Sequence, residues 1–598
     1  MNNRTIIMCT LLFIPCFTPT QPTLLPAQLP PQYPPFLHTP SPWADATLAQ
    51  LSLKEKIGQL FIVAVTSNPA YLPNNAAIDT SQTHQYNMKQ EHIESLIRAY
   101  HIGGVIFLQS NELSAQITLT NHYQALSKLP LLVVQDAEWG LTMRIKNTIR
   151  YPRALTMGAI QDDALLYELG KEIGLQCKTI GVHLNCAPVA DVNNNPCNPV
   201  INDRSFGDDP QRVAVQSVAF MRGMQDAGIL ACAKHFPGHG DTAVDSHIAL
   251  PRIDHSLARL HAVELVPFIH HIRQGVSSIM LAHLHVPALE PRINCPSSLS
   301  RAITTDMLRT TLGFTGLTIT DGMGMQAVLD HYPPGIAEFE AIMAGNDCVL
   351  CPVDVPRAIA LVEQAINDGT LSEDALNQRV LKVLRAKEYV GAHQNRSVSL
   401  QHAQKSLFTA DALALRDAAY YAAITAVPAT DDTQELSTFL DHDCGLIQIG
   451  TPVDNYLLTA LHTHYPHLAS FTISDTALPD DQLLTQLPQK NTLIISIHSA
   501  NKYARQNFGL HPHQIHLVQQ LHQSGKKIVL LLFANPYSRS LFPENVSCIY
   551  AYEDTPVTQR AVVDILLGKT KAGGKLPIAL HVIAKNMCQN NYVTRGVI

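Results

Sequence analysis

The sequence predicts an α/β protein in which a (β/α)8 TIM-like barrel is followed by a smaller open α/β sandwich domain. Eight short apolar runs recur between residues 59 and 351 and alternate with segments whose apolar residues have helical spacing. Polar side chains gather where these runs end, at the edge where a barrel of this type builds its active site. Beyond residue 440, apolar runs again alternate with helical segments, as expected of a second α/β unit.

The eight runs are predicted to be the parallel strands of the barrel. Helices are expected between them, for example over residues 162–177 and 211–227. The predicted barrel strands cover residues 59–65, 103–108, 131–136, 182–189, 229–234, 278–283, 317–321 and 347–351. The predicted strands of the second domain cover residues 446–449, 492–497, 527–533 and 548–552, with a helix over 513–524.

The N-terminus has the organisation of a secretory signal peptide. Arg4 precedes an apolar run over residues 6–17, and a polar stretch follows. This run is too short to cross a bilayer as a mature helix, and Pro15 before Cys16 fits a lipoprotein signal poorly. We therefore expect a periplasmic or secreted protein, with a cytosolic N-terminus as the alternative. The expected organisation is a signal peptide over 1–22, a Pro-rich linker over 23–42, the catalytic barrel over 43–395 and the C-terminal α/β domain over 396–598.

Composition narrows the class of protein. A chain of 598 residues that is 46% hydrophobic and 15% charged is long enough for two or three domains and is not disordered. Its formal net charge of -7 provides no basic surface for nucleic acid or an anionic membrane. Cys348 and Cys351 form a C-x-x-C motif inside an apolar run without a second pair, so we expect buried thiols rather than zinc ligands.

The segment over residues 234–247 carries the densest set of reactive side chains. It contains one lysine, three histidines and two aspartates, and it follows a predicted strand. Asp245 and His247 are two residues apart, so both side chains can point the same way in an extended loop. A carboxylate beside an imidazole fixes its tautomer and stabilises its protonated form, which yields a general acid/base near neutral pH. The alternative is that the pair only braces the loop.

Other candidate residues lie at the ends of different predicted strands. Asp321 ends the seventh run before a glycine-containing turn, where it can serve as a nucleophile, as an anchor or as a helix N-cap. Lys234 and His235 offer hydrogen-bond donors to hydroxyl groups at the end of the fifth run. Arg204 can do the same or can brace a loop through a salt bridge. The third, fourth and sixth runs end near Asp136, Asp191 and His283.

A metal site is the alternative interpretation of the 234–247 segment. By residue type, zinc or manganese could be bound there by His239, Asp241, Asp245 and His247. Their spacing matches none of the standard ligand arrangements. We therefore predict no metal and no cofactor, and a metal-dependent hydrolase remains an alternative.

A series of short motifs, taken in order, resembles glycoside hydrolase family 3 and in particular its bacterial β-N-acetylglucosaminidases. The resemblance spans about residues 43–395 and continues into the second domain. The motifs lie at residues 54–60, 101–105, 136–140, 187–192, 234–247 and 319–325, and then at 535–537 and 574–577. The loop that ends in Asp245, Ser246 and His247 distinguishes this subgroup from the family's β-glucosidases.

The resemblance implies a retaining exo-β-N-acetylglucosaminidase that acts through a covalent glycosyl-aspartate. Asp321 would be the nucleophile, His247 the acid/base and Asp245 its partner. The N-acetylglucosamine in the −1 subsite would be bound by Asp136, Arg204, Lys234 and His235. Gly322 stands where the family often has Ala or Asp, and its lack of a side chain leaves the sugar unobstructed.

The expected partner is a small carbohydrate, namely an N-acetylglucosamine-containing glycoside or a peptidoglycan fragment (muropeptide). We expect no nucleic-acid partner and no stable membrane span, and the sequence does not predict the oligomeric state. A neutral histidine base does not repel an anionic acceptor, so a β-N-acetylglucosaminide phosphorylase is an alternative. A non-catalytic carbohydrate-binding protein is another.

Overall fold

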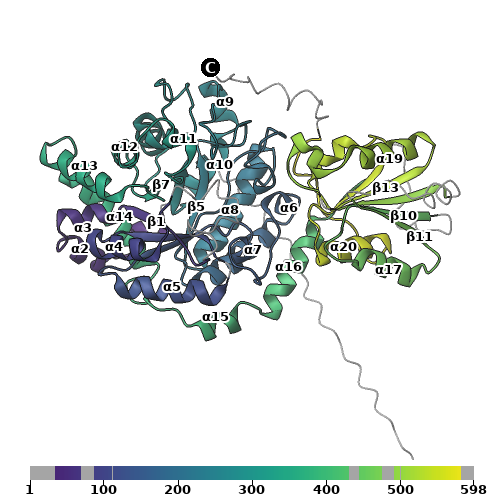
Figure 1. The fold of residues 1–598 in the computed structure, drawn as a ribbon, viewed down its shortest axis with the longest axis horizontal. Helices are drawn as coiled ribbons and strands as arrows, with labels where there is room; N and C mark the ends of the chain where they lie inside the picture. The colour runs from purple at the N-terminus through teal and green to yellow at the C-terminus, as the bar shows by residue number, and fades with distance from the viewer. Residues whose placement is uncertain are drawn as a thin grey trace, which may run out of the picture.

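The computed structural model describes residues 34–68, 86–110, 112–429, 444–474, 490–498 and 500–580. They form a barrel and a second α/β domain, connected by helices α15 (Leu400–Ser406) and α16 (Ala410–Ala423) (Figure 1). The predicted signal peptide over 1–22 lies outside the described residues, as do residues 23–33 of the predicted linker.

The barrel has the eight parallel strands that the sequence predicts. They pair in the order β7-β6-β5-β4-β3-β2-β1-β8. A bridge between Ile319 and Cys348 joins β7 to β8 and completes the ring. The strands are β1 (Phe61–Thr66), β2 (Gly104–Gln109), β3 (Leu132–Gln135), β4 (Leu184–Asn185), β5 (Leu230–Phe236), β6 (Ser278–Leu281), β7 (Leu317–Thr320) and β8 (Val349–Leu350).

Both faces of the barrel strands are buried, which explains why most of the strands are rich in apolar residues. In β1, Ile62 and Ala64 belong to the core inside the barrel, whereas Phe61, Val63 and Val65 pack into the layer beneath the helices. This alternation follows from the two-residue period of a strand. The apolar interior fills the barrel and leaves the chemistry to the carboxyl ends of the strands.

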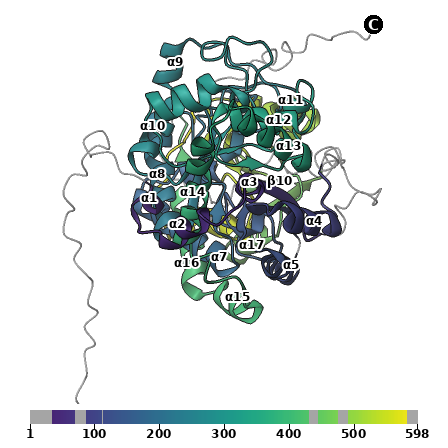
Figure 2. The same ribbon diagram turned by 90° about the vertical axis from the view of Figure 1, so that its left-hand side faces the viewer.

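Helices cover the outside of the barrel (Figures 1 and 2). Their starts follow from local sequence: the Asp209 side chain caps α8 by accepting hydrogen bonds from two backbone N–H groups, and Pro210 occupies the first turn. The helices are α2 (Pro42–Leu48), α3 (Leu53–Gly58), α4 (Gln90–Tyr100), α5 (Leu113–Leu126), α6 (Ala154–Gly158), α7 (Asp163–Thr179), α8 (Pro210–Asp226), α9 (Leu257–Ala262), α10 (Leu265–Arg273), a π-helical stretch (Ala302–Thr311), α11 (Gln326–Leu329), α12 (Ile336–Ala344), α13 (Val355–Asn367) and α14 (Glu373–Tyr389). Within the described parts of the chain, no helix combines the length and apolar character that a membrane crossing requires.

The end of the predicted Pro-rich linker is folded onto the barrel. Residues Pro35–His38 form a short helix, α1, that lies against α14 (Figure 2). Its Phe36 side chain is fully buried and belongs to the same apolar cluster as Val383 and Ala386 of α14. Burial of this ring in an apolar cluster explains why the segment folds onto the barrel.

The second domain is a six-stranded sheet with strand order β11-β10-β12-β13-β14-β9, in which only β9 is antiparallel. Helix α19 (Pro512–Gln523) covers one face, and α17 (Tyr456–His464) and α20 (Pro556–Leu566) cover the other (Figure 1). Four strands were predicted: β10 (Cys444–Ile449), β12 (Thr492–Ile497), β13 (Lys527–Leu532) and β14 (Ser547–Tyr550). The sequence did not reveal the two edge strands, β9 (Thr425–Val427) and β11 (Ala469–Ile473). The first has three residues and the second is mostly half-exposed, so neither forms an apolar run.

Candidate active site

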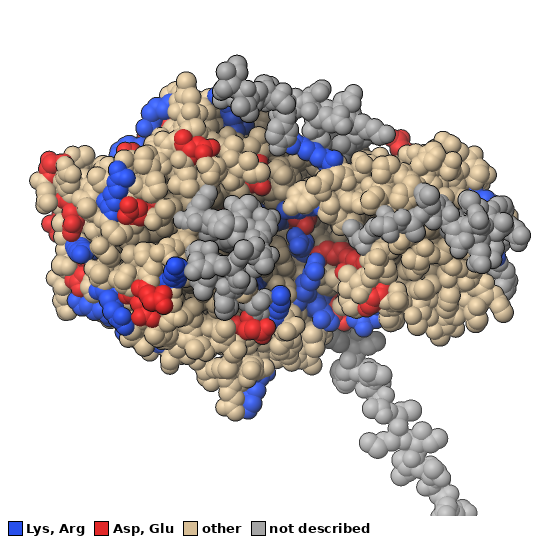
Figure 3. Space-filling model, in the orientation of Figure 1, with Lys and Arg blue, Asp and Glu red and all other residues tan. Residues whose placement is uncertain are grey.

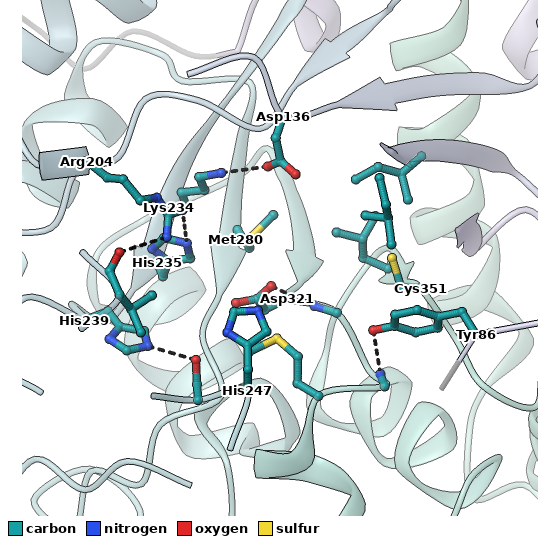
Figure 4. Close-up of a pocket in the computed structure, with 18 of the residues that line it drawn as sticks. Tyr86, Asp136, Arg204, Lys234, His235, His239, His247, Met280, Asp321 and Cys351 are labelled. Carbon is teal, nitrogen blue, oxygen red and sulfur yellow. Dashed lines mark hydrogen bonds and ion pairs between the residues drawn. The ribbon is translucent and has the colours of Figure 1, made fainter. Parts of the chain in front are cut away.

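A cavity of about 290 Å³ opens at the carboxyl ends of the barrel strands (Figure 4). Its polar walls come from residues that follow β3 and β7, from β5 itself and from the loop after β5. Six of the seven predicted site residues line it: Asp136, Arg204, Lys234, His235, His247 and Asp321. The seventh, Asp245, lies behind His247 and is bonded to it.

Asp321 is held rigidly at the end of β7. Its backbone N–H donates to the Leu281 carbonyl at 2.8 Å, and its Oδ1 accepts a hydrogen bond from the Gly322 N–H at 2.8 Å. Burial raises the pKa of Asp321, but the nearby His235 and His283 rings and the Gly322 N–H outweigh burial and leave the pKa lowered. The side chain is therefore an ionised carboxylate at neutral pH, which is the state that a nucleophile needs.

His247 and Asp245 form a bonded pair in the loop after β5. Asp245 Oδ1 accepts from the His247 backbone N–H at 2.9 Å and lies 2.8 Å from its ring Nδ1. Burial raises the pKa of Asp245, but the two hydrogen bonds from His247 outweigh it, and the pKa is lowered. Because Nδ1 is engaged by an anion, Nε2 is the ring nitrogen left to exchange a proton with a ligand in the cavity.

A network of buried charges lies at another side of the cavity, and its Asp136, Lys234 and Arg204 line the cavity (Figure 4). Lys234 Nζ lies 2.8 Å from both Asp136 Oδ1 and Glu138 Oε1, and Glu138 is also paired with Arg204 at 2.7 Å. Burial raises the pKa of Asp136 and of Glu138, yet the cations outweigh it and hold both well below their usual range. Burial lowers the pKa of Lys234, but the same carboxylates raise it overall. The network therefore stays ionised and fixes donors and acceptors for sugar hydroxyl groups.

Arg204 braces its loop through a salt bridge, which is one of the two alternatives that the sequence left open. Its guanidinium makes hydrogen bonds to both oxygens of Glu138, at 3.0 Å from Nε and 2.7 Å from one terminal nitrogen, and so braces the Asn202–Arg204 turn. The same side chain lines the cavity and approaches His235 Nε2 at 3.4 Å.

Asp191 orients His235 from behind. Its fully buried carboxylate lies 2.7 Å from His235 Nδ1 and accepts a hydrogen bond from the backbone N–H of His239 at 2.6 Å. His235 Nε2 consequently faces the cavity. The peptide between Lys234 and His235 is cis.

His283, at the end of β6, supports the turn after the candidate nucleophile. Its Nε2 donates to the Gly322 carbonyl at 3.0 Å, and its Nδ1 lies 2.7 Å from the Ser298 hydroxyl. Nε2 carries the proton for this bond, whereas the Ser298 hydroxyl can either donate to Nδ1 or accept from it. Burial lowers the pKa of His283, which favours the neutral ring.

Three residues in or beside the cavity were not singled out from the sequence: Arg144 and Tyr86 line it, and Glu138 lies behind Lys234 and Arg204. Glu138 lies inside the 136–140 motif, so its position was available as a signal. Arg144, which pairs with Asp136 at 2.6 Å, carried none. Tyr86 accepts a hydrogen bond from the Gly324 N–H at 3.0 Å and lies beside the turn after Asp321, more than 200 residues along the chain.

The four residues considered as metal ligands already make hydrogen bonds or ion pairs with side chains. The His239 ring lies between Thr242 and Ser246, at 2.9 and 3.2 Å, and Asp241 pairs with His255 at 2.8 Å. Asp245 is engaged by His247. The described residues contain no group of three or more His, Cys, Asp or Glu side chains able to hold a metal ion. Cys348 and Cys351 are free, buried thiols.

Known proteins are similar to this chain in sequence and in architecture. Residues 52–386 match the glycosyl hydrolase family 3 N-terminal domain. Beta-hexosaminidase A of Pseudoalteromonas piscicida is 30% identical over 82% of this chain and 91% of its own length, and beta-hexosaminidase LpqI of Mycobacterium tuberculosis is 31% identical over 57% and 84%. The structure of a glycoside hydrolase family 3 beta-N-acetylglucosaminidase from Paenibacillus sp. str. FPU-7 superimposes with a TM-score of 0.72 at 28% identity, covering 89% of this chain and 100% of that one. The chain therefore belongs to glycosyl hydrolase family 3.

Proposed function

We propose that the protein is a retaining exo-β-N-acetylglucosaminidase that removes terminal N-acetylglucosamine from β-glycosides. The observation that carries the proposal is one cavity faced by an ionised Asp321 carboxylate and by the His247–Asp245 pair. The beta-hexosaminidase names of the relatives and the beta-N-acetylglucosaminidase with a matching structure support the same sugar.

In the first step, Asp321 attacks the anomeric carbon while His247 Nε2 protonates the departing glycosidic oxygen. The negative charge of Asp245 stabilises the imidazolium that is ready to donate and fixes the ring. The aglycone leaves with the proton, and the sugar remains bonded to Asp321 through its anomeric carbon.

In the second step, the neutral His247 Nε2 takes a proton from a water molecule, whose oxygen attacks the anomeric carbon. Asp321 leaves as a carboxylate, and two inversions restore the β configuration. Meanwhile Asp136, Lys234, Arg204 and His235 hold the sugar hydroxyl groups.

For the natural substrate we propose peptidoglycan-derived fragments outside the cytoplasm. The support is the signal-peptide character of residues 1–22 in the sequence. Processing of that segment is tested by sequencing the N-terminus of the protein recovered from its native cells. Recovery of the intact segment on a soluble intracellular protein would contradict this location.

Proton NMR of the first product formed from an aryl β-N-acetylglucosaminide tests the mechanism. We expect β-N-acetylglucosamine to appear first, at a rate that does not depend on phosphate. Initial α product would exclude double displacement, and accumulation of a sugar 1-phosphate with phosphate-dependent turnover would identify a phosphorylase instead.

Substitution of the nucleophile tests the assignment of Asp321. Asp321→Asn should lower kcat by more than about 10³-fold, because an amide cannot form the glycosyl ester. Asp330→Asn is the matched control, since Asp330 is exposed next to α11 and does not line the cavity. Near-normal turnover by Asp321→Asn would remove this residue from the role.

A further inference from the structure

A second cavity, of about 660 Å³, lies between the barrel and the second domain. Its walls include Trp139, Arg153 and Asp203 from the barrel, and Lys502, Tyr503 and Glu553 from the second domain. In Figure 3, charged side chains gather along this junction, whereas most of the visible face of the second domain is uncharged.

Most charges that line the cavity already have partners. Glu553 pairs with Arg150 at 2.7 Å, and Asp203 Oδ2 pairs with Arg153 at 2.8 Å. Arg204 is paired with Glu138, and Asp554 with His498 at 2.9 Å. Lys502 is different, because its ammonium makes no ion pair or hydrogen bond with any residue that the structure describes.

Two further groups around Lys502 are free to bind a ligand. The neighbouring Tyr503 ring is 44% exposed, and its centroid lies 5.8 Å from Lys502 Nζ. Asp203 Oδ1 is buried without a hydrogen-bond partner among the described residues. Burial lowers the pKa of Lys502, and attraction by Asp203 offsets this only in part. An added anion would compensate the desolvated ammonium.

This cavity adjoins the catalytic cavity. Arg204 lines both. The Asn202 side chain donates to the Lys502 carbonyl at 3.2 Å, and Arg505 donates to the carbonyl of Ala243, in the loop that carries His247, at 3.4 Å. The second-domain segment that holds Lys502 and Tyr503 therefore touches both the Arg204 turn and the acid/base loop.

We propose that the interdomain cavity binds a carboxylate-bearing sugar. Lys502 would bind the carboxylate, Tyr503 would pack against the face of the sugar ring, and Asp203 Oδ1 would accept a hydrogen bond from a hydroxyl or amide group. The sugar is either the aglycone of the substrate, in which case the proposal rests on the proposed function, or a separate acidic ligand.

Two matched disaccharides test the first source. In one, N-acetylglucosamine is β-1,4-linked to glucuronic acid, and in the other to glucose. The two differ only in that the acid has a carboxylate where glucose has a hydroxymethyl group. In Lys502→Gln, the ratio of kcat/KM for the acidic over the neutral disaccharide should fall about tenfold, as expected for loss of one charge-assisted hydrogen bond. Lys502→Arg should retain most of the ratio. Lys571→Gln is the matched control, an exposed lysine away from this cavity, and should leave the ratio unchanged.

Calorimetric titration with glucuronate tests the second source, with glucose as the neutral reference. Glucuronate binding that weakens about tenfold in Lys502→Gln, with no change in the disaccharide ratio, identifies a separate ligand. If neither measurement depends on Lys502, the proposal is wrong. If no glycoside is cleaved at all, the proposed function fails, and the titration alone still decides whether the cavity binds the acid.

Discussion

Asp245 uses one oxygen to bind both the ring and the backbone N–H of His247. These two hydrogen bonds fix the orientation of the His247 ring. The substitution Asp245→Asn would keep an acceptor for the His247 backbone N–H but would remove the negative charge beside the His247 ring. The pair therefore has the geometry that the proposed acid/base role requires.

We expect His247→Ala to slow the hydrolysis of phenyl β-N-acetylglucosaminide by about 10²–10⁴-fold, the usual contribution of general acid catalysis. Formation of the glycosyl-enzyme from the 2,4-dinitrophenyl glycoside should be affected far less, because that leaving group needs no proton. Release of the phenol in single-turnover experiments, with enzyme in excess, measures this step for both substrates. Equal losses on the two substrates would mean that another group supplies the proton.

The effects of substitutions at Gly322 and at Tyr86 are predicted to be coupled. A Cβ added at Gly322 would lie 2.9 Å from the Tyr86 hydroxyl, with no other heavy atom closer than 3.9 Å. Gly322→Ala should therefore displace Tyr86 from the Gly324 N–H and disturb the turn after Asp321, lowering kcat/KM about tenfold. Tyr86→Phe removes the clashing atom, so the double variant should be as active as Tyr86→Phe alone.

Gly324→Ala provides the control for this double-mutant cycle. A Cβ there would lie 2.4 Å from a carbon of the Tyr86 ring, which Tyr86→Phe retains. The phenylalanine should therefore not rescue Gly324→Ala. Additive effects of Gly322→Ala and Tyr86→Phe would show that the two residues do not interact as described.

At the scale of elements, the sequence predicts those strands that are buried on both faces. Most of the barrel strands are rich in apolar residues for this reason, and the polar residues that follow them could be assigned to one edge. The edge strands β9 and β11 lack this signal. Tyr86 and Arg144 could not be found either, because each acquires its place only from a contact that folding brings about.

His183, just before β4, makes the barrel sensitive to acid. Its Nδ1 accepts a hydrogen bond from the Val133 N–H of β3 at 3.0 Å, which a protonated Nδ1 cannot do. Burial, assisted by the charge of Lys387, lowers its pKa from 6.5 to about 4. Between these values the unfolded chain binds a proton that the folded barrel does not. Stability from this residue is therefore complete above pH 6.5 and is lost as the pH falls toward 4, by about 3 kcal/mol.

His183→Asn should remove this dependence, because Asn Oδ1 can accept the same hydrogen bond and does not titrate. Urea unfolding followed by fluorescence of Trp43 and Trp139, both in the barrel, measures the free energy of unfolding at pH 6.5 and at pH 4. The loss between these values should be about 3 kcal/mol smaller in the variant than in the wild type. His261→Asn, exposed on α9, is the control, and an equal loss in all three proteins would contradict the prediction.

At the scale of the whole molecule, the second domain is bonded to the catalytic barrel by buried polar contacts. Glu553, only 6% exposed at its side chain, accepts hydrogen bonds from the Arg153 backbone and the Thr156 hydroxyl, both at 2.8 Å. Tyr537 from the same domain donates to the Asn193 carbonyl at 3.2 Å. These bonds reach the segments that carry Arg153 and Asn193, next to the catalytic cavity. We therefore expect the two domains to stabilise one another.

Glu553→Gln tests this coupling, because the substitution lies in the second domain and both tryptophans lie in the barrel. Glutamine Oε1 can retain the bonds from Arg153 and Thr156, but its NH₂ group would face the Arg150 guanidinium, so two donors would meet where Oε2 now accepts at 2.7 Å. The free energy of unfolding reported by fluorescence should fall by about 1–3 kcal/mol. Glu544→Gln, exposed in the same domain, should leave it unchanged. If the barrel fluorescence transition is the same in both variants, the domains unfold independently and Glu553 holds only its own domain.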